Sequence, residues 1–137
     1  MAATTPVGVY PNGQTGFRVD ELITLFKDDY SGAGTQHSSR WRVGTTSGMT
    51  VILWDSGLRE NDDHEQGDNW CEFQPAACEA STSTTPGLLP GVTYYWDVEV
   101  RNTGYEISSK STARAFTMES APSVGPTLSA ANWQRAQ

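Results

Sequence analysis

The sequence predicts an all-β domain in which two antiparallel sheets pack face to face as a sandwich and an extended C-terminal arm follows. The 137-residue chain is rich in Thr and Ser, holds 13 Gly and 7 Pro, and contains few of the residues that favour helices. Short segments with strand patterning alternate with turn residues, as in two-sheet sandwiches. The length suits one domain, and the five Trp can help to fill one core.

Strand patterning begins near the N-terminus. Residues 17–27 carry β-type apolar side chains, and a loop rich in Gly and Asp follows them. Within residues 39–46, Trp41 and Val43 lie on one face of the expected strand and two Arg lie on the other. This period of two predicts a half-buried strand, and residues 50–55 are expected to form the next one.

A long irregular segment is expected at residues 56–78, which are polar and include an acidic run at 60–65. This run departs from the helix-loop-helix calcium pattern, and charge that keeps a sheet edge solvated is preferred over weak calcium binding. Cys71 and Cys78 are the chain's two cysteines, and a local disulfide and two free thiols both remain open. Neither His is spaced with them as a zinc ligand, so no metal site is expected. Residues 79–85 are expected to form a short strand.

The clearest strand is expected at residues 94–101. Tyr94 and Trp96 share one face with two Val, while mostly polar side chains occupy the other face. A last strand is expected at residues 110–118, with Phe116 pointing inward. The predicted structural core therefore includes Trp41, Tyr94, Trp96 and Phe116.

The segment from Leu88 to Tyr94 resembles a fibronectin type III domain, which has an immunoglobulin-like fold. The family pattern is a Leu, one residue, Pro-Gly, two residues and a Tyr that opens a strand, and it is matched by Leu88, Pro90, Gly91 and Tyr94. The resemblance implies that Tyr94 is the corner tyrosine, whose hydroxyl bonds the backbone near the preceding loop. Bacterial and phage variants resemble the chain at three further places: Pro11-Asn12-Gly13, Ser39-Arg40-Trp41-Arg42-Val43 and Phe116-Thr117.

The resemblance covers residues 6–118. It implies a sandwich domain at 1–118 with a long inserted loop at 56–78, followed by the extended arm at 119–137. The chain departs from the family where many members carry a Trp on the second strand, a place that falls here to Leu25 or Phe26. A sandwich hosts many functions, so the resemblance informs the fold more than the activity.

Composition excludes several classes of function. The net charge is −7 and no cluster of Lys and Arg is present, so nucleic acid is not an expected partner. The longest apolar runs are too short for membrane insertion as a span. Adjacent carboxylates at Asp28-Asp29 and Asp62-Asp63 fall on expected loops, where neighbouring side chains diverge. We therefore expect neither catalytic residues nor a cofactor.

Partner-binding residues are expected among large apolar side chains that the core does not need. Trp70 and Phe73 fall in the irregular segment at 56–78, and Leu128 and Trp133 are spaced along the polar arm. Aromatic side chains at such places suit a protein surface or the rings of a glycan.

These features favour a non-enzymatic structural or interaction protein. The first hypothesis is a virion surface component, either a capsid decoration or a fibre protein, whose partners are capsid or fibre subunits or a second copy of the chain. It accounts for an extracellular type of fold in a sequence without a visible signal peptide. The alternative is a carbohydrate-binding or adhesion module of a secreted bacterial protein, with a glycan as its ligand. The expected location is a virion surface or the extracellular space.

Overall fold

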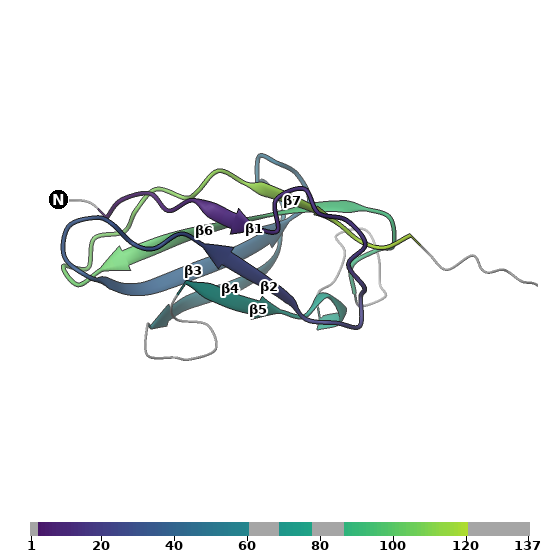
Figure 1. Ribbon diagram of the computed structural model, residues 1–137, viewed down its shortest axis with the longest axis horizontal. Helices are drawn as coiled ribbons and strands as arrows, with labels where there is room; N and C mark the ends of the chain where they lie inside the picture. Colours follow the sequence, from purple (N-terminus) through teal and green to yellow (C-terminus); the bar gives the residue numbers. More distant parts are fainter. Residues whose placement is uncertain (1–2, 61–68, 78–86, 121–137) are drawn as a thin grey trace, which may run out of the picture.

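The computed structural model describes residues 3–60, 69–77 and 87–120. Within these residues, seven strands form two antiparallel sheets. One sheet has the strand order β1-β2-β5 and the other the order β4-β3-β6-β7, and the two lie against each other as layers (Figure 1). The expected two-sheet sandwich is therefore confirmed.

The strands differ in length between the two sheets. The three-stranded sheet contains β1 (Gly8–Tyr10), β2 (Ile23–Lys27) and β5 (Trp70–Phe73). The four-stranded sheet contains β3 (Gln36–Gly44), β4 (Ile52–Glu60), β6 (Thr93–Asn102) and β7 (Arg114–Thr117). A single turn of 3-10 helix, η1 (Pro75–Ala77), follows β5. The described chain begins at one end of the long axis and leaves at the other (Figure 1).

The core lies between the sheets and contains the four side chains that the sequence assigned to it. Trp41, Trp96 and Phe116 are fully buried, and Tyr94 is nearly so. Trp41 of β3 stacks on Trp96 of β6 with a centroid distance of 5.9 Å. β3 and β6 are the two middle strands of the four-stranded sheet and pair with each other, so their inward side chains form the centre of this core.

The corner at the start of β6 has the geometry that the resemblance implied. The backbone N–H of Leu89 donates a hydrogen bond of 2.9 Å to the hydroxyl oxygen of Tyr94. Gly91 adopts a φ of +73°, a conformation that glycine reaches without steric cost. On β2, Leu25 is fully buried whereas Phe26 is 41% exposed, so Leu25 occupies the place of the missing second-strand Trp.

The expectation of one irregular segment over residues 56–78 is wrong at both ends. Strand β4 continues to Glu60, and residues 70–73 form β5 against β2. The pairing of β4 with β3 shifts register near Gly57, which has a φ of +69°. A bulge of this kind interrupts the alternation of side chains and hides the strand from a period-two pattern. The short strand expected at 79–85 lies outside the described residues.

Two other strands are shorter than expected. Strand β2 begins at Ile23 rather than at residue 17, and β7 begins at Arg114 rather than at residue 110. Before β7, the hydroxyls of Ser108 and Ser111 each accept a hydrogen bond of 3.0 Å from a backbone N–H of β6. These two serine hydroxyls thus accept hydrogen bonds from backbone N–H groups of β6 that a longer β7 was expected to pair with through its backbone. No helix in the described ranges is long and apolar enough to cross a membrane.

Candidate functional site: an aromatic row on the three-stranded sheet

The outer face of the three-stranded sheet carries one aromatic side chain on each of its strands. Tyr10 of β1 pairs with Phe26 of β2, and Phe26 pairs with Trp70 of β5. Direct cross-strand partners project from the same face of a sheet. Tyr10, Phe26 and Trp70 therefore form one line across all three strands, which we call the aromatic row.

The backbone explains why these three rings face outward. On β2, Leu25 and Lys27 are buried, so Phe26 between them points away from the core. On β5, Cys71 is buried and Trp70 projects to the opposite side. On β1, the pairing shifts register between Gly8 and Tyr10, and this irregularity brings Tyr10 opposite Phe26.

The row is exposed and its rings are tilted. Tyr10 is 38% exposed, Phe26 is 41% exposed and Trp70 is half-buried. The rings of Tyr10 and Phe26 are 6.5 Å apart with an angle of 59° between their planes. Tyr10 also meets Phe17 edge-on at 6.3 Å, with an angle of 68°. These tilted contacts support Tyr10 from two sides without forming a flat surface.

The row places apolar side chains on the outer face of a sheet whose inner face is also apolar. The inner face of β2 and β5 supplies Ile23, Leu25, Cys71 and Phe73 to the core. An antiparallel sheet with one solvated face ordinarily carries polar side chains there. Grouped exposed aromatics are an interaction signal, whereas single exposed apolar residues are not. The aromatic row is therefore the candidate binding surface.

The outer face of the four-stranded sheet has the opposite character. Arg40 donates hydrogen bonds to Asp55, and Arg42 donates from Nε to Asp97 over 2.9 Å. The Nζ atom of Lys110 lies 3.2 Å from a carboxylate oxygen of Glu99. The charges of Arg40, Arg42 and Lys110 are thus compensated by carboxylates on neighbouring strands.

The ion pair between Arg40 and Asp55 favours the ionised form of the Asp55 carboxylate. The hydrogen bond from Arg40 lowers the pKa of Asp55, and the same contact raises the pKa of Arg40. The hydrogen bond to Asp97 likewise raises the pKa of Arg42. A general acid needs a carboxyl group that holds its proton near neutral pH, and Asp55 is shifted in the opposite direction. Residues 3–60, 69–77 and 87–120 also contain no group of three or more His, Cys, Asp or Glu that could hold a metal ion.

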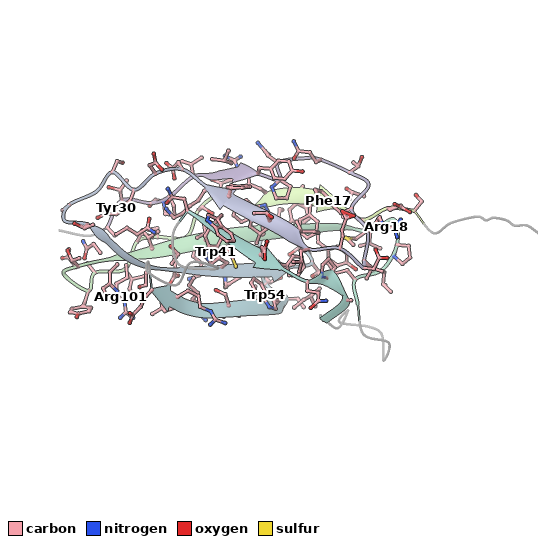
Figure 2. The ribbon with its side chains drawn as sticks, turned by 60° about the horizontal axis from the view of Figure 1, so that its bottom comes forward. Phe17, Arg18, Tyr30, Trp41, Trp54 and Arg101 are labelled. Atoms are coloured by element: carbon pink, nitrogen blue, oxygen red, sulfur yellow. The ribbon has the colours of Figure 1, made fainter. Side chains whose placement is uncertain are left out.

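A small apolar pocket lies at the end of the sandwich where the described chain leaves. Its volume is about 230 Å³, and Phe17, Val19, Leu88, Pro90 and Met118 line it. Figure 2 shows Phe17 and Arg18 at this end, beside the departing chain. Ligand pockets are usually 300–1,000 Å³, so this one is below the common size for a small-molecule site.

Of the residues predicted to bind a partner, Trp70 lies in the aromatic row. The prediction for Phe73 is wrong, because its side chain is 1% exposed and packs against Phe116 in the core. Leu128 and Trp133 lie outside the described residues. Cys78 does too, so a disulfide with the buried Cys71 and two free thiols both stay open.

Sequence reasoning missed Tyr10 and Phe26 as parts of the surface. A signal for Phe26 was present in the run 23–27, where it alternates with Leu25 and must face the other way. No comparable signal exists for Tyr10, because its orientation depends on the register shift in β1.

Comparison with known proteins identifies the architecture. No protein-family model and no curated protein sequence matches the chain. Among solved structures, the chain is similar to the α-L-rhamnosidase of Dictyoglumus thermophilum, with 11% identity, a TM-score of 0.59 and coverage of 87% of this chain. The α-L-rhamnosidase of Streptomyces avermitilis, solved with L-rhamnose, gives 20% identity, a TM-score of 0.55 and coverage of 89%. The chain spans 12% of the length of each rhamnosidase.

The third structure consists of fibronectin(III)-like modules from Clostridium thermocellum CbhA. It gives 8% identity and a TM-score of 0.51, and the match covers 86% of this chain and all of that one. At these identities the likeness concerns the fold. Together with the strand order and the tyrosine corner, it shows that this chain has a fibronectin type III-like fold.

Proposed function

We propose that this fibronectin type III-like chain is a non-catalytic accessory module that docks against another protein domain through its aromatic row. The observation that carries the proposal is the cross-strand line of Tyr10, Phe26 and Trp70 on an otherwise solvated sheet face. Aromatic side chains contribute most of the binding energy in many protein interfaces, because they bury a large area with few rotatable bonds.

Ring geometry favours a protein over a glycan as the occupant. A sugar ring stacks on the face of an aromatic ring, and a row of sugars therefore needs rings with similar planes. The planes of Tyr10 and Phe26 differ by 59°, and those of Tyr10 and Phe17 by 68°. Such rings suit apolar side chains that insert between them. The exposed Glu72 lies on the same face of β5, next to the row, so the partner surface should place a basic side chain opposite it.

An accessory role agrees with the arrangement of the described chain ends, which lie at opposite ends of the long axis (Figure 1). This arrangement suits a module placed between neighbours. It also agrees with the likeness to a small part of two glycoside-cleaving enzymes and to a whole set of fibronectin(III)-like modules. We therefore place the chain, in this proposal, beside a domain of an extracellular bacterial protein.

The hypothesis of a virion surface protein draws less support than this one. Two of the residues expected to bind its partner, Leu128 and Trp133, lie outside the described residues. The three similar structures named above are two α-L-rhamnosidases and a set of fibronectin(III)-like modules, and none of these three is described as a virion protein. We therefore prefer the alternative from the sequence, a module of a secreted bacterial protein, and propose that it binds a protein rather than a carbohydrate.

The test compares two Lys substitutions at equally exposed apolar positions. Phe26 is 41% exposed in the row, and Val51, which precedes β4 in the other sheet, is 42% exposed. The wild-type chain is used to capture proteins from its source, and the captured protein is then purified and titrated by calorimetry. Phe26→Lys should weaken binding at least tenfold, whereas Val51→Lys should leave it unchanged.

Two results would contradict this function. In one, the purified partner binds both variants as it binds the wild type. In the other, the chain binds a soluble polysaccharide, added at millimolar sugar concentration, and Phe26→Lys abolishes that binding. The second result would assign the row to glycan recognition.

A further inference from the structure

The last residue of β2, Lys27, is one of only two lysines in the chain and is 4% exposed. Its Nζ atom donates hydrogen bonds to the backbone oxygen of Asp28 at 2.9 Å and to Oδ1 of Asn69 at 2.8 Å. It also donates to the side-chain oxygen of Gln36. The amine is therefore held in one place, against a primary amide, on the inner side of the three-stranded sheet.

Asn69 is placed by the sheet itself. It directly precedes β5, and its backbone oxygen accepts a hydrogen bond of 2.9 Å from the backbone N–H of Lys27. The two residues thus continue the register in which Phe26 faces Trp70. The Nδ2 atom of Asn69 donates to a carboxylate oxygen of Asp29. An amine, an amide and a carboxylate therefore meet at the end of β2 and β5.

We propose that Lys27 and Asn69 form an isopeptide bond within the chain, with Asp29 as the proton-transfer group. These three side chains are the groups that such a reaction requires: a nucleophile, an acyl group and an acid–base catalyst on the leaving nitrogen. Hydrogen bonding to Oδ1 holds Nζ beside the amide carbon, and fixing two reactants in this way greatly accelerates their reaction.

The step balances without a co-reactant. The neutral amine of Lys27 attacks Cγ of Asn69, so that the Nζ–Cγ bond forms and the Cγ–Nδ2 bond breaks. One proton of Nζ passes to the carboxylate of Asp29 and from there to Nδ2, which leaves as ammonia. The product is a secondary amide that joins β2 to β5, and nothing is oxidised or reduced.

The bond would secure a sheet whose hydrogen-bonded pairing is short. Strand β5 has four residues and pairs with β2 alone among the described strands. A covalent link next to the pair of Phe26 and Trp70 would prevent β5 from separating when a partner pulls on the aromatic row. The resistance of β5 to being pulled away from β2 does not depend on which partner binds the row.

Intact mass of the full chain, reduced to remove any disulfide, tests the proposal. We expect a mass lower than the sequence mass by one ammonia molecule. Trypsin should fail to cut after Lys27, and the peptides that contain Lys27 and Asn69 should remain joined. Lys110→Arg is the matched control, since it removes the other lysine and should retain the loss of ammonia.

Further variants separate the bond from other reactions. Lys27→Arg and Asn69→Ala should each restore the sequence mass, and Asp29→Asn should leave most molecules unlinked while circular dichroism shows an intact fold. Cyclisation of an Asn with its own backbone also releases ammonia, but it would persist in Lys27→Arg and would overturn the proposal. A wild-type chain that has its full sequence mass after prolonged incubation at neutral pH would overturn it as well.

Discussion

Two buried tryptophans should respond differently to the same substitution. Trp41 and Trp96 lie on the adjacent strands β3 and β6, are both fully buried and stack on each other. The Nε1–H of Trp96 donates a hydrogen bond of 2.8 Å to the backbone oxygen of Pro11. The Nε1–H of Trp41 is buried without a hydrogen-bond partner among the described residues. We therefore expect Trp96→Phe to destabilise the protein more than Trp41→Phe.

The size of the difference follows from the one contact that distinguishes the sites. Both substitutions remove the same ring atoms from neighbouring, fully buried positions, so their packing losses are similar. Trp96→Phe also leaves the buried oxygen of Pro11 without this donor, which costs about 1–3 kcal/mol. Trp41→Phe instead removes a buried donor that has no acceptor. The free energy of unfolding should differ between the variants by at least about 1 kcal/mol.

Urea unfolding monitored by far-ultraviolet circular dichroism measures this difference without depending on tryptophan fluorescence. The two variants should have the same m-value and different midpoints. For a domain of this length, each kcal/mol corresponds to roughly 3–6 °C in Tm. Equal midpoints, or a lower midpoint for Trp41→Phe, would refute the argument from the hydrogen bond to Pro11.

Three further changes test the corner, the ion pairs and the approach of β1 to the core. Tyr94→Phe removes the acceptor of the Leu89 N–H and should lower the free energy of unfolding by about 1–3 kcal/mol in urea titrations. Arg40 lowers the pKa of Asp55 in the folded protein below the value of about 3.9 that it has in the unfolded chain. The ionised carboxylate therefore stabilises the fold fully above about pH 3.9, and this stabilisation is lost as the pH falls through the pKa of the folded state. Asp55→Asn should therefore lower the urea midpoint at pH 7, and the gap to the wild type should narrow at pH 3. Gly8→Ala would place its Cβ 2.9 Å from an arginine carbon and 3.0 Å from a buried indole, so thermal scans should show a Tm lower by several degrees.

The centre of the fold was predictable because its sequence signals are local. Alternation over 94–101 identifies the inward face of β6, and the Leu-x-Pro-Gly-x-x-Tyr pattern predicts the corner hydrogen bond between Leu89 and Tyr94. In both cases the residues that carry the signal are within a few positions of one another. The buried positions of Trp41 and Phe116 follow from the same alternation on the neighbouring strands β3 and β7.

The aromatic row was not predictable in the same way, because it depends on pairing between distant segments. Trp70 is 44 positions after Phe26, and only the register of β2 with β5 brings them together. Phe73 was assigned to the surface because its polar neighbours suggested a loop. In a strand, however, Phe73 and Cys71 share the inward face while Trp70 and Glu72 share the outward one.

Strand β2 is the middle strand of the three-stranded sheet, and its side chains contribute to both faces of that sheet. Leu25 enters the core, Phe26 forms the centre of the aromatic row, and Lys27 faces Asn69 at the inner edge. Because side chains alternate along a strand, Phe26 projects to the face opposite Leu25 and Lys27, so substitutions at Phe26 and at Lys27 change different faces of the sheet. A partner that binds Phe26 would therefore load the strand that the proposed Lys27–Asn69 bond secures. Force applied at the aromatic row is thus carried along β2 to the proposed link. Phe26→Lys tests the binding surface, and Lys27→Arg tests the link.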